Sequence, residues 1–152
     1  MLIENPLNSS PLIFPVLEVF HIVGFAVAVG TVSIVDFRLL NWGMRHQKPA
    51  ELAKDTGLWT LSALIVVIFS GLLLFSSDPD MYYLNWSFLL KMVFLILAIT
   101  FNYTIHRKVV MRGASPGSTK LVALVSLLLW VAVVFGGIFI AFIRQGLSLS
   151  ES

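Results

Sequence analysis

Four long apolar stretches constrain the fold of this chain more than any other feature of its sequence. They cover about residues 12–40, 58–75, 86–107 and 121–143. Because roughly 20 mostly apolar residues in a helix are enough to cross a bilayer, each stretch predicts a membrane-spanning helix. The connections are short, which makes successive helices antiparallel neighbours. The sequence therefore predicts an all-α integral membrane protein, with residues 1–152 forming a single four-helix antiparallel bundle.

The composition excludes several classes of protein. Charged residues make up 12% of the chain and hydrophobic residues 58%, whereas a soluble domain carries about 25% charged residues. The chain has no cysteine, which excludes disulfides, thiolate metal sites, iron–sulfur ligation and covalently attached c-type haem. The formal net charge is only +2, so no nucleic-acid partner is predicted.

The distribution of charge predicts how the bundle lies in the membrane. Eight of the ten Lys and Arg residues fall in the connections after the first and third stretches or at the ends of the neighbouring stretches, where the positive-inside rule places the cytoplasm. They are Arg38, Arg45, Lys48, Lys54, Arg107, Lys108, Arg112 and Lys120. Both termini are therefore expected outside. The N-terminal segment lacks the basic region of a signal peptide, so the first span is expected to be retained. We expect a multi-pass protein of the bacterial inner membrane, in contact with the lipid bilayer and with other membrane subunits or further copies of itself.

Polar residues within the spans predict two polar levels inside the bundle. At about 100° per residue, they gather on one stripe of each helix, and in lipid such a stripe is expected to face the interior. Ser62, Ser70 and Ser126 are expected to face inward in this way.

The first level lies near the outer surface. Glu18, His21 and Lys91 are expected to form a buried polar cluster there, with Lys91 beside Glu18 or His21. A charge pair that is neutralised in lipid is one interpretation, and proton or quinone chemistry is another. The Glu-x-x-His motif occurs only once, whereas di-iron bundles need two copies and further glutamates. No metal site is therefore predicted.

The second level lies near the cytoplasmic surface. It contains Asp36 and Arg38 from the first span, with Asn102 and His106 from the third. A salt bridge between Asp36 and Arg38 at the membrane border is expected, and the alternative is that Arg38 binds a lipid phosphate.

Two histidines are the candidate cofactor-binding residues. His21 and His106 are the polar groups that suit a haem or a quinone. Ligation of one haem by both would need the two imidazoles at one depth, whereas His21 is expected at the outer level and His106 at the inner level. A b-type haem therefore stays one alternative, and the cofactor is left open. The chain has no phosphate-binding loop, nucleophile triad or zinc helix, so no catalytic residue and no enzyme are predicted.

Two segments resemble helices of a known family. They are HIVGFAVAVGTVSIVDFRLLNWG and NWSFLLKMVFLILAITFNYTIHRKVV. The resemblance is to a family of small uncharacterised bacterial four-helix inner-membrane proteins, which is distantly similar to the membrane part of CopD-type copper-resistance proteins. The family pattern matches His21, Asp36, Arg38, Lys91, Asn102 and His106. This resemblance implies copper or redox neighbours.

Three functions remain as hypotheses. The first is a non-catalytic integral membrane subunit or anchor of a larger complex, such as a redox or respiratory complex, which fits the small mass outside the spans. The second is a b-type cytochrome or a quinone-interacting electron-transfer protein, based on His21 and the inner polar level. The third is a transporter of protons, metals or small solutes, based on the two polar levels.

Overall fold

The computed structural model describes residues 10–150, without the side chains of Met81, Ala141 and residues 143–150. Within this range the chain is all-α and contains no strand. The long helices are α1 (Ile13–Leu39), α2 (Pro49–Ser77), α4 (Trp86–Phe101) and α6 (Pro116–Ser150). A short helix, α3 (Pro79–Tyr83), joins α2 to α4. The α4 helix continues through a π-helical turn, η2 (Asn102–His106), into α5 (Arg107–Arg112).

Four of the described segments are long and apolar enough to cross a membrane. They are Ile13–Leu39, Pro49–Ser77, Trp86–Arg112 and Pro116–Ile140. The predicted all-α class and its four span-capable helices are thereby confirmed. The second helix starts at Pro49, well before the predicted span at Leu58, because the residues of the predicted connection from Pro49 onward are helical as well.

Residues with known preferences for helix ends set the boundaries. Pro49 occupies the first turn of α2, where a missing N–H costs little. Asn85 caps α4, because its Oδ1 accepts a hydrogen bond of 2.9 Å from the backbone N–H of Ser87. Gly113 ends α5 with a φ of +74°, a conformation that favours glycine. Local sequence therefore accounts for the connections that orient the helices.

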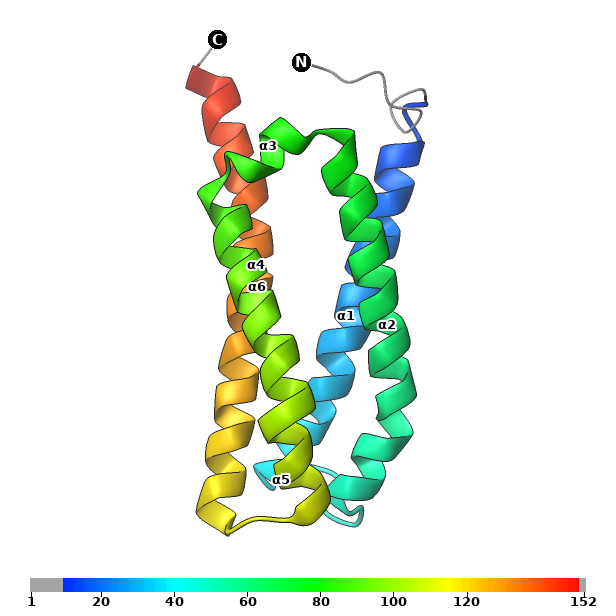
Figure 1. Cartoon of the computed structure of the whole chain (residues 1–152), viewed down its shortest axis with the longest axis vertical. Coiled ribbons are helices and arrows are strands. Elements are labelled where there is room, and N and C mark those ends of the chain that lie inside the picture. Colours follow the sequence, from blue (N-terminus) through cyan, green and yellow to red (C-terminus); the bar gives the residue numbers. More distant parts are fainter. Residues whose placement is uncertain (1–9, 151–152) are drawn as a thin grey trace.

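The helices form two antiparallel hairpins, one of α1 with α2 and one of α4–α5 with α6 (Figure 1). The hairpins pack on each other through α1 with α6 and through α2 with α5. The start of α1, the α3 turn and the end of α6 lie at one end, and the α1–α2 and α5–α6 connections lie at the other (Figure 1). We name the first the outer end and the second the inner end, after the predicted orientation.

An apolar cluster fills the middle of the bundle. It consists of Ala28, Val32, Ala63, Leu64, Ala98, Trp130 and Val133. All four long helices contribute to it, and the rings of Phe25 and Trp130 contact each other beside it at 6.4 Å between centroids. The exposed large residues are mainly Leu, Val, Ile and Phe, which suits contact with lipid. This cluster separates the polar groups of the outer end from those of the inner end.

Candidate functional site

The central feature of the inner end is a hydrogen bond between Asp36 on α1 and His106 on η2. The Nε2 atom of His106 lies 2.7 Å from Oδ1 of Asp36. Asp36 is 0% exposed and His106 is 4% exposed. Hydrogen bonds to charged groups are short and strong, and they gain strength where water is excluded. The structure thus joins two residues that the sequence places at one depth.

The π-helical turn accompanies this contact. The backbone N–H of Arg107 donates to the carbonyl of Asn102, five residues earlier, so the turn is one residue wider than an α-helical turn. The wider turn changes the direction of His106 relative to α4. Such turns are frequent at functional sites. No proline or glycine occurs between Asn102 and His106, so the sequence carries no visible signal for it.

A serine from α6 completes the buried polar spot. The Ser126 hydroxyl is 1% exposed and is near enough to Asp36 to interact with its carboxyl group. Within the described residues, neither Ser126 Oγ nor Asp36 Oδ2 has a hydrogen-bond partner of regular geometry. A bare charge in this setting would be very costly. We therefore expect Asp36 and His106 to be neutral as a pair, holding one exchangeable proton between them.

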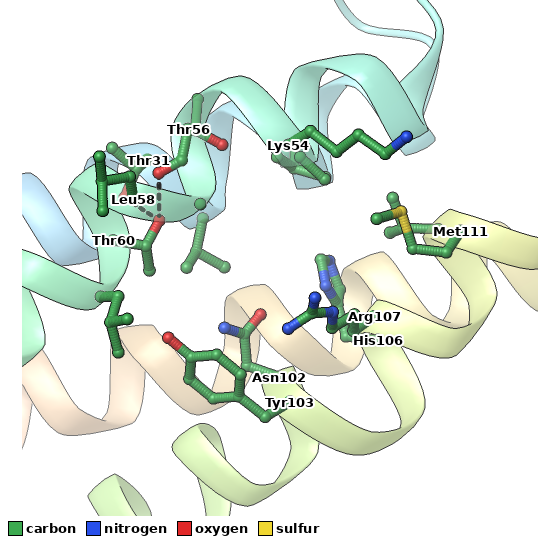
Figure 2. A pocket seen from close by; sticks show the side chains of 16 residues that line it. Thr31, Lys54, Thr56, Leu58, Thr60, Asn102, Tyr103, His106, Arg107 and Met111 are labelled. Atoms are coloured by element: carbon green, nitrogen blue, oxygen red, sulfur yellow. Dashed lines mark hydrogen bonds between the residues drawn. The ribbon is translucent and has the colours of Figure 1, made fainter.

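A cavity of about 410 Å³ lies beside His106, between α1, α2, η2 and α5. Figure 2 shows Asn102, Tyr103 and Arg107 on one side of the cavity, with Thr56 and Thr60 across from them. The polar residues of the wall are Thr31, Lys54, Thr56, Thr60, Asn102, Tyr103, His106 and Arg107. The rest of the wall is apolar or glycine, and it contains no Asp or Glu. The wall therefore suits a ligand that has hydrogen-bond acceptors on an apolar body.

The polar side chains of the wall differ in whether they are free to form a hydrogen bond with a ligand. Thr60 donates to Thr31 Oγ1 at 2.8 Å, and Thr31 in turn donates to the backbone of its own helix, so these hydroxyls serve the α1–α2 contact. By contrast, the side chains of Asn102, Tyr103 and Arg107 make no hydrogen bond to any part of the chain that the structure describes. These three donors are available to a ligand. The sequence analysis selected Asn102 but missed Tyr103, Arg107 and Lys54. Tyr103 and Arg107 are close to His106 in the sequence, whereas Lys54 on α2 had no such signal.

Arg38 has a different role from the one expected. Its Nε donates to the carbonyl of Gln47 at 2.6 Å, and its Nη1 donates to Oδ1 of Asn41 at 3.1 Å. Asp36 bonds to His106 instead. The expected Asp36–Arg38 salt bridge is wrong, because two positions along a helix turn the side chains by about 200°. Arg38 holds the α1–α2 connection.

The outer level is formed only in part. His21 lies near Lys91 and hydrogen-bonds through Nδ1 to Ser70 Oγ at 3.0 Å. Glu18 is exposed, so its predicted place in the buried cluster is wrong. The buried face of α1 continues back from Gly24 through His21 and Leu17, which leaves Glu18 beside it. Ser70 and Ser126 are buried as expected, whereas Ser62 is exposed and its predicted inward position is wrong.

The two candidate histidines lie far apart. His21 and Asp36 are fifteen positions apart on one helix, which corresponds to about 22 Å along its axis. Because His106 bonds to Asp36, it belongs to the opposite level from His21. The described residues include no group of three His, Asp or Glu side chains that could hold a metal ion.

The fold and the site define a class: an all-α protein with four span-capable helices and a polar cavity at one end of its bundle. Within that class, the chain belongs to the DUF6644 family, a family of unknown function, whose model matches residues 13–143. No curated protein and no solved structure matches the chain. No named relative therefore links it to CopD-type proteins.

Proposed function

We propose that this chain is a membrane-embedded subunit of a redox complex, that it binds the head of a quinone in the inner cavity, and that it exchanges a proton with this ligand. One observation carries the proposal. His106 lines the cavity and is hydrogen-bonded to Asp36, a carboxyl group with no exposed surface. A ligand in the cavity meets an imidazole whose proton is shared with a buried acid.

The wall supports a quinone as the ligand. A quinone head is a flat apolar ring with two carbonyl oxygens that accept hydrogen bonds, and Asn102, Tyr103 and Arg107 are donors without partners in the described protein. Leu58, Leu61 and other apolar side chains of the wall suit the ring and the start of an isoprenoid tail. A volume of about 410 Å³ falls in the usual range of roughly 300–1,000 Å³ for small-molecule sites.

The buried pair supplies proton chemistry that a quinone needs. Reduction of a quinone to a hydroquinone takes up two electrons and two protons. In this proposal a redox subunit of the same complex supplies the electrons, and one proton passes from His106 to the nearer quinone oxygen. Nδ1 is the ring nitrogen left for this transfer, because Nε2 is engaged with Asp36. The second proton, and the one that restores the pair, come from water at the inner end.

The cytochrome and transporter hypotheses receive less support from this geometry. His21 and His106 belong to levels about 22 Å apart, and each has one ring nitrogen hydrogen-bonded to a neighbouring side chain. The apolar cluster around Trp130 and Val133 lies between the two polar levels, so no polar pathway connects them in the described bundle.

The proposed location is a bacterial inner membrane, with both termini outside. The charge distribution supports this orientation, because eight of ten Lys and Arg residues lie in the two connections of the inner end or in the helix ends beside them. The cavity would then open near the cytoplasmic surface, from which its protons would come. The resemblance of two helices to a family that is itself distantly similar to the membrane part of CopD-type proteins also suggested redox neighbours.

Quinone binding tests this proposal directly. The purified protein in lipid nanodiscs is titrated with a short-chain ubiquinone analogue and with menadione, and binding is measured by calorimetry. We expect saturable binding in the wild type. Because a lost hydrogen bond to a ligand costs about 1 kcal/mol or more, Asn102→Leu and His106→Gln are each expected to raise Kd roughly five- to ten-fold.

Thr104→Val is the matched control. Thr104 lies on the same π-helical turn, is exposed, and donates to the carbonyl of Thr100 rather than lining the cavity. Its replacement is expected to leave Kd unchanged. The absence of saturable binding, or an equal Kd in all variants, contradicts the proposal. A Soret band in protein from haem-replete cells would favour the cytochrome hypothesis instead.

A further inference from the structure

The Lys91 side chain is a cation that has no counter-ion in the part of the outer half that the structure describes. Lys91 lies in the second turn of α4 and is largely shielded by its neighbours. Among the side chains that the structure describes, no carboxylate lies within ion-pair distance of its ammonium group. Glu18, the expected partner, is exposed on α1. A charge inside a membrane protein is costly unless it is paired.

Close packing holds this cation between the helices. A Cβ atom on Gly136 of α6 would lie 3.0 Å from the Lys91 Cβ and 3.2 Å from its Cα, so the two backbones are in near contact. A Cβ on Gly137 would lie 3.6 Å from the Lys91 Nζ. The same Nζ lies 5.8 Å from the centre of the Phe25 ring on α1, at the distance of a cation–π contact. The lysine therefore extends along α6 and toward α1.

The two polar side chains that the structure joins at this level, those of His21 and Ser70, supply no negative charge. The Ser70 hydroxyl donates to the carbonyl of Val66 at 2.6 Å, so its oxygen accepts the hydrogen bond from the Nδ1–H of His21. A Cβ on Gly71 would lie 3.1 Å from the Cε1 of His21, so this imidazole fills the contact between α1 and α2. His21 and Ser70 shape the outer level, and neither carries the negative charge that Lys91 needs.

The position of Lys91 favours an anion from the lipid headgroup layer. Lys91 comes five residues after Trp86, the first residue of α4, which places it about 7.5 Å below the helix start. Trp86 and Tyr83 are exposed at this end, as aromatic residues at a membrane interface are. The ammonium group of Lys91 lies toward Phe25 in the structure, and the length of a lysine side chain lets this group turn toward the interface when an anion is there.

Helices α2 and α4, which belong to different hairpins, are not closely packed against each other. In the described part of the chain, backbone packing between the hairpins comes from α1 with α6 and from α2 with α5, which lies at the inner end (Figure 1). At the outer tip, α2 and α4 meet through the stacked rings of Phe75 and Phe88, with centroids 5.7 Å apart. We propose that Lys91 binds the phosphate of an anionic phospholipid of the outer leaflet, which enters beneath these rings.

Lipid retention tests this assignment independently of quinone binding. The wild type and the variants Lys91→Met and Lys91→Arg are reconstituted in phosphatidylcholine nanodiscs with and without phosphatidylglycerol. Native mass spectrometry measures retained lipid, and thermal unfolding measures Tm. The wild type and Lys91→Arg are expected to retain phosphatidylglycerol and to gain Tm from it. Lys91→Met is expected to bind it roughly ten-fold more weakly, as the loss of a charge-assisted hydrogen bond implies.

Two further arms keep the assignment falsifiable. Lys120→Met, an exposed cation at the inner end of α6, is the control and is expected to retain phosphatidylglycerol like the wild type. Inorganic phosphate added to phosphatidylcholine nanodiscs is expected to leave Tm unchanged. If phosphate raises Tm as much as phosphatidylglycerol does, the site takes free anions and the lipid assignment is overturned. Equal retention by the wild type and by folded Lys91→Met, checked by circular dichroism, also overturns it.

Discussion

His106 and Asp36 are seventy positions apart in the sequence and 2.7 Å apart in the structure, measured from Nε2 to Oδ1. They come from different hairpins, one from η2 and one from α1. Their hydrogen bond therefore ties the two hairpins together at the inner end, next to the cavity. This contact stabilises the bundle, and in the proposed function it also supplies the proton for the bound ligand.

The first prediction concerns the stability that this pair confers. Asp36→Leu or His106→Leu alone leaves a buried polar partner unsatisfied, so each is expected to lower the free energy of unfolding by about 3–5 kcal/mol. The double variant removes both groups and is expected to lose less than the sum of the two. Urea unfolding in mixed micelles measures the free energy of unfolding of the wild type, the two single variants and the double variant, which together form a double-mutant cycle. Simple additivity would mean that the two residues are energetically independent.

A second prediction addresses the hydroxyl contact between α1 and α2. Thr60→Val removes the hydrogen bond of 2.8 Å to Thr31 and keeps the side-chain volume. Polar contacts of this kind in membrane proteins contribute about 0.6 kcal/mol on average, so a small loss of that size is expected in the same unfolding assay. Ser62→Ala, on the exposed face of α2, is the control and is expected to have no effect.

A third prediction tests the close approach of α4 and α6. Gly136→Ala would place a methyl group 3.0 Å from the Lys91 Cβ, so the helices must separate at a cost of about 1–3 kcal/mol. Gly30→Ala is the matched control, because a Cβ at Gly30 meets nothing within 4 Å. This control is expected to stabilise α1 by about 0.5–1 kcal/mol, since alanine favours a helix over glycine. A neutral Gly136→Ala would show that the two helices are not in close contact.

A fourth prediction concerns the α1–α2 connection. Arg38→Lys keeps the charge but cannot reproduce the forked contacts to Gln47 and Asn41. The connection is expected to loosen by about 1–2 kcal/mol, and trypsin should cut faster after Arg45. Arg112→Lys, an exposed cation at the end of α5, controls for the arginine-to-lysine change itself. Unchanged cleavage in Arg38→Lys would rule out this role for the guanidinium group.

A fifth prediction fixes the orientation in the membrane. A reporter that is active only outside the cytoplasm, fused after Ser152, is expected to be active, because the cationic connections favour the cytoplasm. A reporter fused within the α5–α6 connection, after Ala114, is expected to be inactive. The opposite pattern would reverse the assignment of the inner and outer ends.

The fold follows from the sequence because lipid imposes a simple pattern. Apolar stretches of sufficient length predicted the four span-capable helices, and Pro49, Asn85 and Gly113 lie at helix ends where such residues are favoured. The depth of each polar residue also follows from counting along a helix, which placed Asp36 and His106 at one level. The rise per residue is constant in a helix, so a count is a measurement of depth.

The faces of the helices were harder to predict. The buried face of α2 runs through Thr60, Val67 and Ser70 and leaves Ser62 outside, although Ser62 and Ser70 share a stripe on a helical wheel. A helical wheel gives the angular positions of residues around one helix. Which face is buried depends on where the neighbouring helices pack. For the same reason Glu18 was placed inside the bundle and Arg107 was missed.

The π-helical turn between Asn102 and His106 has a mechanical consequence for the whole third span. One additional residue shifts everything after it by about 100° around the helix axis. The segment before the turn keeps its phase toward α6, while α5, after the turn, is set separately toward α2. The parts of this span before and after the turn therefore have different rotations about the helix axis. Deletion of one residue here would make the helix regular, so that the contacts of α4 with α6 and of α5 with α2 could not both be kept.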